Sequence, residues 1–233
     1  EVMLPLTVTL TEITWEHIGS RFGHARFLQQ MTTCQLVGFV NWTMIPGMNS
    51  IWEALLEALP PATGSRGLIF FDLADPEKRP KEDILEALRL ITRFEAHFQV
   101  VLGLNEKEAR EVGSALGLET GDPTPEGLEQ LTARIRKRVP VSTIVVHPVR
   151  YALTVGDQGI QRIDGLCTET PLITTGAGDH FNAGFCLGKL LGFDDRTCLL
   201  TGVTTSGYYV RNARTPSAAD LVDQFRHWPD DHV

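Results

Sequence analysis

Four short, nearly continuous apolar runs divide the chain up to residue 146, at residues 34–40, 67–73, 98–104 and 142–146. Runs of this length and composition are typical of strands that are buried on both faces. A helical pattern of apolar residues lies between each run and the next. Strands and helices that alternate in this way form parallel sheets with right-handed crossovers. The sequence therefore predicts an α/β protein with three layers (α/β/α) and a mostly parallel central sheet.

Two further strand-like segments, residues 151–155 and 159–163, follow the last of these runs. The turn signal Gly156-Asp157-Gln158 separates them, so the pair predicts a β-hairpin at one edge of the sheet. Residues 3–10 alternate loosely between apolar and polar and predict one more strand. No internal repeat, low-complexity tract or linker interrupts the pattern, and residues 1–233 are expected to form a single domain.

The composition excludes several classes of partner. The chain has 233 residues, of which 42% are hydrophobic and 21% charged, and its formal net charge is −8. This balance argues against nucleic acid or an anionic membrane as a partner, because both attract basic surfaces. No apolar run approaches the length of a membrane span, and no signal peptide is visible. The 4 cysteines are widely spaced without metal-ligand spacing, which favours a reducing, cytoplasmic setting.

A glycine-rich turn leads into a helical pattern in the later part of the chain, at Thr174-Thr175-Gly176-Ala177-Gly178-Asp179. The first N–H groups of a helix have no partner within it, and the helix dipole adds partial positive charge there. Glycines let phosphate oxygens reach those N–H groups, so the turn predicts an anion-binding site. Asp179 could then take a proton from a hydroxyl while the N–H groups hold a phosphoryl group. A plain helix start with an acidic first turn is the structural alternative.

Gly184 and Gly188 lie four residues apart in the helix that follows the turn. Residues at this spacing share one face of a helix. A face without side chains predicts that another backbone packs closely against it.

The glycine-rich turn resembles the C-terminal signature of the PfkB (ribokinase-like) family of carbohydrate kinases, which reads Asp-Thr-x-Gly-Ala-Gly-Asp. This chain matches the signature from Thr174 onward, and Ile173 stands in place of the leading acid. The resemblance implies a ribokinase-like fold and ATP-dependent phosphoryl transfer to a hydroxyl of a sugar or related small molecule, with ATP and Mg²⁺ as cofactors. It implies Asp179 as the catalytic base. It implies a phosphate-binding anion hole formed by Thr174, Thr175, Gly176, Ala177 and Gly178.

The segment Asn105-Glu106-Lys107-Glu108, after the third apolar run, resembles the Asn-x-x-Glu motif of the same family. That motif orders magnesium and phosphate, often through water, so Asn105 and Glu108 are the expected magnesium residues. Magnesium keeps several of its waters and needs few protein ligands. An Asn cap with Glu three residues later is also a common helix start, and the two roles can coexist.

Polar residues after two other apolar runs give candidate substrate contacts, because ligands of open α/β sheets bind at the carboxyl ends of the strands. Residues 71–79 are similar to the family's Asp-x-Asn-x-Arg stretch, with stretched spacing and no Asn. Asp72 is therefore expected to face the phosphate or the substrate, and a solvated loop is the alternative. Asn41 and Trp42 are suited to contact a sugar, whereas a buried Trp at a strand end is the favoured alternative for Trp42.

The chain also departs from the family pattern. Residues 146–151 lack both glycines of a Thr-x-Gly-x-x-Gly turn that the family places near nucleotide phosphates. Arg150 could supply charge there instead, and His147 is interpreted as an ordinary strand-end residue. The family's N-terminal sugar-binding acid and lid strands are not recognisable, so the domain is expected to lack that substrate and lid segment.

These departures leave several questions open at the level of sequence. They motivate an alternative function, a kinase-like regulator that binds a sugar or nucleotide and is impaired in catalysis. The phosphate acceptor stays open among sugars, nucleosides and vitamin-type alcohols. A monomer and a homodimer both remain compatible with the sequence.

Overall fold

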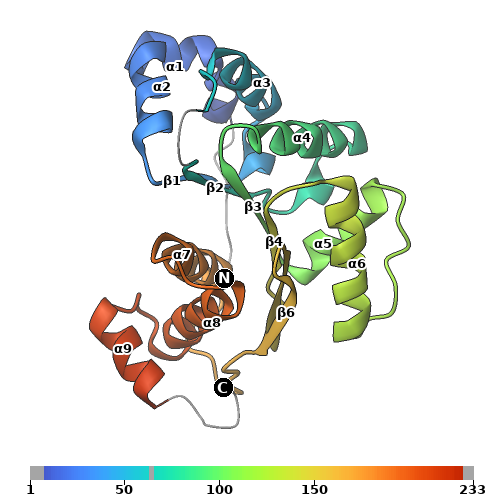
Figure 1. The fold of residues 1–233 in the computed structure, drawn as a ribbon, viewed down its shortest axis with the longest axis vertical. Helices are drawn as coiled ribbons and strands as arrows, with labels where there is room; N and C mark the ends of the chain where they lie inside the picture. Colours follow the sequence, from blue (N-terminus) through green and yellow to red (C-terminus); the bar gives the residue numbers. More distant parts are fainter. Residues whose placement is uncertain (1–7, 63–65, 228–233) are drawn as a thin grey trace.

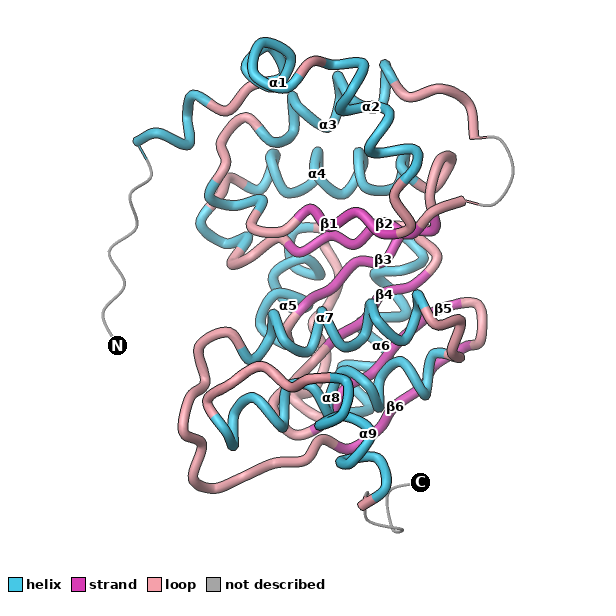
Figure 2. Tube along the Cα trace, turned by 90° about the vertical axis from the view of Figure 1, so that its left-hand side faces the viewer, coloured by secondary structure: helices cyan, strands magenta, loops and turns pink. Residues whose placement is uncertain are grey.

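A computed structural model of the protein describes residues 8–62 and 66–227. Within these ranges the strands form one sheet in the order β1-β2-β3-β4-β5-β6, so each strand lies beside its neighbour in the sequence (Figure 2). β1 to β4 are parallel, and β5 and β6 are each antiparallel to the preceding strand. The strands are β1 (Leu36–Phe39), β2 (Leu68–Asp72), β3 (Gln99–Leu104), β4 (Thr143–Val146), β5 (Tyr151–Gly156) and β6 (Gly159–Asp164).

Helices cover both faces of the sheet and complete three layers, with α1 to α6 on one side and α7 to α9 on the other (Figure 1). The predicted fold class is therefore confirmed. The helices are α1 (Trp15–Phe22), α2 (His24–Thr33), α3 (Met48–Ala58), α4 (Lys81–Phe94), α5 (Glu106–Ala115), α6 (Pro125–Arg138), α7 (Ala177–Leu190), α8 (Asp195–Asn212) and α9 (Ala218–Arg226). Short 3-10 helices are η1 (Val8–Glu12), η2 (Trp42–Met44) and η3 (Pro76–Lys78). In the part of the chain that is described, no helix combines the length and apolar character needed to cross a bilayer.

Alternate residues of the central strands contribute to two separate hydrophobic cores. On β2, Ile69 and Phe71 join the core beneath α3 to α6, whereas Leu68 and Phe70 join the core beneath α7 and α8. Burial on both faces requires apolar residues at successive positions. This requirement explains why the sequence shows continuous apolar runs and not strict alternation.

The predicted strand at residues 3–10 is wrong where the structure describes it. Val8–Glu12 forms the 3-10 helix η1, and residues 3–7 lie outside the described residues. The backbone bonds locally, for example from Ile13 N–H to Leu10 O at 3.3 Å. A short alternating segment forms a strand only when a neighbouring strand supplies partners for its backbone groups.

Gly184 and Gly188 bring α7 and α8 together, as their spacing predicts. A Cβ on Gly184 would lie 2.7 Å from the carbonyl oxygen of Thr201, and one on Gly188 would lie 3.0 Å from the Cα of Cys198. Helix α8 therefore packs against the bare backbone of α7. This packing fixes the position of α7 relative to the sheet.

Candidate active site

A pocket of about 390 Å³ brings together the carboxyl ends of β3 and β4, the glycine-rich turn and one face of α8. Four of the predicted site residues line it: Asn105, Thr174, Ala177 and Gly178. Asn105 follows β3, whereas the other three belong to the turn before α7 and to its first residues. The fold therefore joins two predicted motifs that lie far apart in the sequence.

The glycine-rich turn has a backbone geometry that depends on Gly176. This residue is the N-cap of α7 and has φ +84°, in the left-handed region that glycine adopts at low cost. The N–H of Ala177 donates to Thr174 O at 3.1 Å, and the N–H of His180 donates to Gly176 O at 3.1 Å. Helix geometry leaves the N–H groups of Gly178 and Asp179 without acceptors in α7. Those two N–H groups are therefore the ones available to a ligand, whereas that of Ala177 is engaged in the turn.

Side chains of α8 hold this turn in place. The Tyr209 hydroxyl donates to Thr175 O at 3.0 Å, and the Ser206 hydroxyl donates to Ala177 O at 2.9 Å. The His180 ring stacks on Tyr209 with ring centroids 3.6 Å apart, and its Nδ1 lies 2.7 Å from Gly176 O. These residues support the turn from the side of α8, and sequence reasoning did not identify Tyr209 or Ser206.

Asp179 lies in the first turn of α7, and its side chain is exposed. Its carboxylate makes no hydrogen bond or ion pair with any other residue in the ranges 8–62 and 66–227. Its charge nevertheless acts on Asp72, at the end of β2. The Asp179 carboxylate is therefore available to a ligand at the point where α7 begins.

Asp72 is held from two sides. Its Oδ1 accepts a hydrogen bond from the N–H of Ala74 at 2.9 Å, and its Oδ2 accepts one from Nδ2 of Asn182 at 2.9 Å. Burial, together with the negative charges of Glu108 and Asp179, raises the pKa of Asp72 to about 6. Three carboxylates from β2, α5 and α7 thus concentrate negative charge in one place. A divalent cation would relieve this repulsion.

Asn105 and Glu108 form a reciprocal capping box at the start of α5. Asn105 Oδ1 accepts from the N–H of Glu108 at 2.9 Å, and Glu108 Oε2 accepts from the N–H of Asn105 at 2.8 Å. The buried Glu108 also accepts at Oε1 from the N–H of Asp75 at 2.9 Å. The capping alternative is confirmed, and each carboxylate oxygen keeps one further lone pair for a water.

The donor set fits Mg²⁺ held through water better than Mg²⁺ held directly. Among the described residues no group of three or more His, Cys, Asp or Glu side chains is arranged to hold a metal ion. Glu108 is already bonded to two backbone N–H groups, and Asp72 to two donors. Magnesium retains several waters in protein sites, and those waters can bridge to such carboxylates.

The loop after β2 adopts an uncommon backbone conformation. Ala74 and Asp75 have φ of 56° and 58°, in the left-handed region that few residues other than glycine occupy. Their N–H groups are those that bond the carboxylates of Asp72 and Glu108. Backbone strain of this kind collects at functional sites, where the surroundings hold it in place. In this conformation the loop after β2 donates a hydrogen bond to each of the two carboxylates.

Asn41 is not brought together with the other predicted residues. It is exposed at the carboxyl end of β1 and does not line the pocket. Trp42 is fully buried, its Nε1 donates to Asn49 at 2.7 Å, and the Arg79 guanidinium lies 4.4 Å from its ring centroid. The structural alternative for Trp42, a buried residue at a strand end, is confirmed. A sugar contact by Asn41 stays a prediction.

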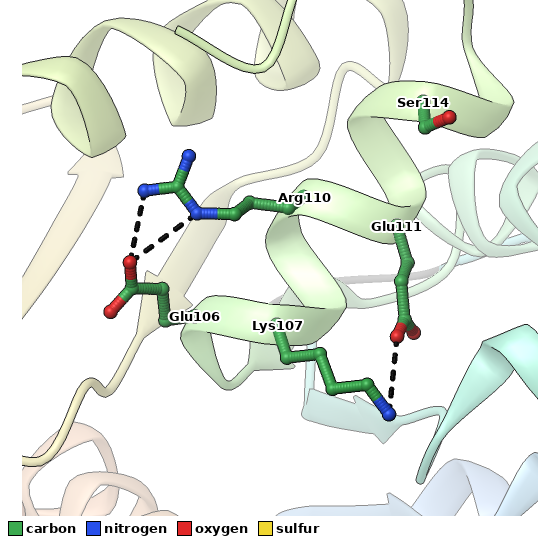
Figure 3. Close-up of a pocket in the computed structure, with 5 residues that line it drawn as sticks. All are labelled: Glu106, Lys107, Arg110, Glu111 and Ser114. Atoms are coloured by element: carbon green, nitrogen blue, oxygen red, sulfur yellow. Dashed lines mark hydrogen bonds and ion pairs between the residues drawn. The ribbon is translucent and has the colours of Figure 1, made fainter. Parts of the chain in front are cut away.

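A second hollow, of about 550 Å³, lies over α5 and is unrelated to the glycine-rich turn. Figure 3 shows that its lining side chains all come from this helix. Arg110 Nη2 donates to Glu106 at 2.9 Å, and Lys107 Nζ lies 3.4 Å from Glu111. Because these charges pair with one another along one helix, we interpret the hollow as a solvated helix face.

Replacing Asp72 with asparagine is expected to stabilise the protein above pH 6. Between pH 3.8 and about 6 the folded protein keeps a proton on Asp72 that the unfolded chain has lost. The free energy of unfolding therefore falls as pH rises through this range, and the penalty persists above it. Removing the charge should raise the free energy of unfolding by about 1–3 kcal/mol at pH 8 and by little at pH 4.

Urea denaturation of the Asp72→Asn variant at pH 4, 6 and 8 measures this effect. The exposed Asp164→Asn variant is the control and should change stability by less than about 0.5 kcal/mol. An equal loss of stability for Asp72→Asn at all three pH values would show that its hydrogen bonds outweigh the charge penalty.

Comparisons with known proteins identify the family of this chain. Residues 1–228 match the model of the family described as prokaryotic ketohexokinase. A ketohexokinase of Haloferax volcanii is 27% identical over 222 residues, which cover 95% of this chain and 58% of that protein. The chain therefore spans somewhat more than half the length of this relative.

Solved structures share the fold at low sequence identity. The ribokinase of Thermotoga maritima has a TM-score of 0.64 at 15% identity, covering 86% of this chain and 59% of that one. The adenosine kinase of Schistosoma mansoni, solved with 2-fluoroadenosine, has a TM-score of 0.65 at 18% identity, covering 90% of this chain and 59% of that one. The resemblance to the PfkB (ribokinase-like) family is thus confirmed. By the match over residues 1–228, the chain belongs to the prokaryotic ketohexokinase family.

Proposed function

We propose that residues 1–233 form, as a single domain, the phosphoryl-transfer site of an ATP-dependent carbohydrate kinase. The acceptor is a hydroxyl of a sugar or a related small molecule. One observation carries the proposal. The Asp179 carboxylate, which has no partner among the described residues, lies in the first turn of α7, near enough to Asp72 for its charge to act there, and it directly follows Gly178, which lines the pocket.

Asp179 is the proposed general base. Its carboxylate accepts the proton of the acceptor hydroxyl while the hydroxyl oxygen bonds to the γ-phosphorus of ATP. The bond from that phosphorus to the bridging oxygen breaks, and ADP leaves with the electron pair. A positioned base of this kind contributes about 10²–10⁴ in rate. Exposure of the Asp179 side chain in the first turn of α7 supports this role.

The start of α7 is the proposed anion hole, with Thr174, Thr175, Gly176 and Ala177 shaping the turn. The N–H groups of Gly178 and Asp179 face the charge that develops on the transferring phosphoryl group, assisted by the helix dipole. Gly178 presents no side chain, so phosphate oxygens can approach its backbone. The contacts from Tyr209 and Ser206 keep this turn preorganised.

Asn105, Glu108 and Asp72 are the proposed magnesium residues, acting through water. When bound, Mg²⁺ neutralises phosphate charge at the site of transfer. The repulsion that raises the pKa of Asp72 supports this proposal, because a cation would lower it. The protein residues themselves orient water molecules and keep the loop after β2 in its left-handed conformation.

The pocket of about 390 Å³ is the proposed nucleotide site. Its size lies within the range of small-molecule pockets. Apolar residues such as Phe181, Val203 and Val210 line it together with residues of the glycine-rich turn. This combination suits a ligand that carries both an apolar ring and phosphates.

The cytoplasm is the proposed location. The four cysteines are free thiols, and Cys34 and Cys167 are exposed. Exposed free thiols persist in reducing compartments.

ATP is expected to protect Cys167 from alkylation. Cys167 is exposed and lines the pocket, whereas Cys34 is exposed before β1, at the other end of the strands. ATP with Mg²⁺ at ten times its Kd should slow iodoacetamide labelling of Cys167 about tenfold, because only the free protein reacts. Peptide mass spectrometry measures both thiols in one sample, and Cys34 is the internal control. Equal labelling of Cys167 with and without ATP would place the nucleotide elsewhere.

A phosphoryl-transfer assay tests the function itself. The name of the Haloferax volcanii relative makes a ketohexose the first acceptor to test, with ribose and adenosine as alternatives. ATP-dependent formation of a phosphorylated acceptor is the expected result. Nucleotide binding without transfer to any acceptor would instead favour a regulator with impaired catalysis.

A further inference from the structure

His147 is held in the proposed nucleotide pocket by contacts of its main chain and of its ring. It directly follows β4, and its backbone N–H donates to Leu104 O at 3.0 Å, which extends the β3–β4 ladder by one bond. Its ring packs on Phe181 with centroids 4.8 Å apart. It also lines the pocket beside Gly178. Both its main chain and its ring are therefore held by neighbours.

Gly178 makes room for the imidazole. A Cβ on Gly178 would lie 3.2 Å from Cε1 of His147 and 3.9 Å from Nε2. The ring thus rests directly against the backbone that begins α7. Any anion bound by the first turn of α7 lies within reach of this ring.

The His147 ring has unused hydrogen-bonding capacity. It is half-buried, and it makes no hydrogen bond to another of the residues in the ranges 8–62 and 66–227. Burial lowers its pKa to about 4, so the ring is neutral at physiological pH. A neutral imidazole carries one N–H donor. The hydrogen-bond partner of the ring determines which of the two nitrogens carries the proton. No partner among the described residues sets it, so a ligand can.

We infer that His147 is a phosphate-binding residue of the nucleotide pocket, its ring N–H donating to a phosphate oxygen held at the start of α7. The inference rests on the proposed function and adds a side chain to it. His147 acts together with the N–H groups of Gly178 and Asp179, from a position directly beside Gly178. It adds a donor without adding a full charge to the site.

Two variants of similar length separate hydrogen bonding from packing. His147→Met fills the space with a flexible apolar chain, and His147→Gln replaces it with a chain that carries an N–H donor. Equilibrium Kd values for ATP, ADP and adenosine are measured for both, with thermal denaturation as a check on folding. His97→Met, at a half-buried histidine whose ring is bonded to Pro60 O outside the pocket, is the matched control.

The Met variant is expected to bind ATP and ADP about tenfold more weakly, the effect of losing one hydrogen bond to a charged group. Its affinity for adenosine should be unchanged, and the Gln variant should recover most of the lost affinity. In phosphoryl-transfer kinetics the Met variant should raise the KM for ATP more than it lowers kcat. The His97→Met control should match the wild type in all of these measurements.

Three outcomes overturn the assignment. Equal losses for adenosine and ATP would mean that the ring acts by packing or contacts the nucleoside. If the Met and Gln variants had equal affinities, or if neither lost affinity, a hydrogen bond from His147 to phosphate would be excluded. The proposed kinase function would be unaffected by that result. Failure of the wild-type protein to bind ATP, ADP or adenosine would overturn both the assignment and the proposed function.

Discussion

Replacing Asp179 with asparagine is expected to lower kcat about 10²–10⁴-fold and to leave nucleotide affinity nearly unchanged. Asparagine is nearly the same shape but cannot accept the proton of the acceptor hydroxyl. The carboxylate has no partner among the described residues, so its loss breaks no hydrogen bond within them. Nucleotide affinity should hold because the backbone N–H groups at the start of α7 stay in place. Initial rates with the accepted sugar, together with Kd for ATP, measure the two quantities separately.

Asp122→Asn is the matched control for this change, since Asp122 is exposed in the loop between α5 and α6 and does not line the pocket. It should retain wild-type kcat. A variant at Asp179 that kept most of the wild-type turnover would exclude this residue as the base. A large loss of ATP affinity without loss of kcat would indicate a binding role instead.

Replacing Gly184 with alanine is expected to lower the free energy of unfolding by about 2 kcal/mol or more. The added Cβ would lie 2.7 Å from Thr201 O and closer still to the Thr205 hydroxyl, which itself donates to Thr201 O. Alanine improves helix propensity by about 1 kcal/mol relative to glycine, but that gain is smaller than the overlap with a backbone atom of α8. Because α7 carries the proposed anion site, its displacement should also weaken ATP binding.

Thermal and urea denaturation test this expectation, and a fall in Tm of several degrees should accompany the loss. Gly38→Ala is the matched control, because a Cβ on Gly38 would meet no atom within 4 Å. That variant should have the stability of the wild type or slightly more. If Gly184→Ala were as stable as Gly38→Ala, the α7–α8 contact would have to be looser than this structure describes.

Much of the fold was predictable because strand burial is recorded locally in the sequence. Each central strand lies inside one apolar run, as β2 (Leu68–Asp72) lies within residues 67–73. The hairpin was predictable for a similar reason, since a turn signal separates β5 and β6. Residues 3–10 were mispredicted because loose alternation over a few residues does not reveal whether a partner strand is present.

The candidate site was predictable only where its residues form short motifs. The glycine-rich turn and the Asn105–Glu108 capping box each lie within a few residues of sequence. Tyr209 and Ser206 reach the turn only because α8 packs on α7, and nothing near them in the sequence marks that contact. The sequence suggests only an ordinary strand-end role for His147, because its contact with Gly178 forms only in the folded protein.

The strictly sequential order of the sheet has a consequence for how the protein is made. A chain leaving the ribosome can add each strand from β1 to β6 to a neighbour that has already been synthesised. The helices α7 and α8 behave differently, because they return to β2, and the hydrogen bond from Asn182 to Asp72 joins residues 110 positions apart. Such distant contacts form late, since a long stretch of chain must be closed first. A nascent chain therefore completes its sheet before α7 and α8 can pack on it, and the proposed phosphate site is assembled only after the sheet.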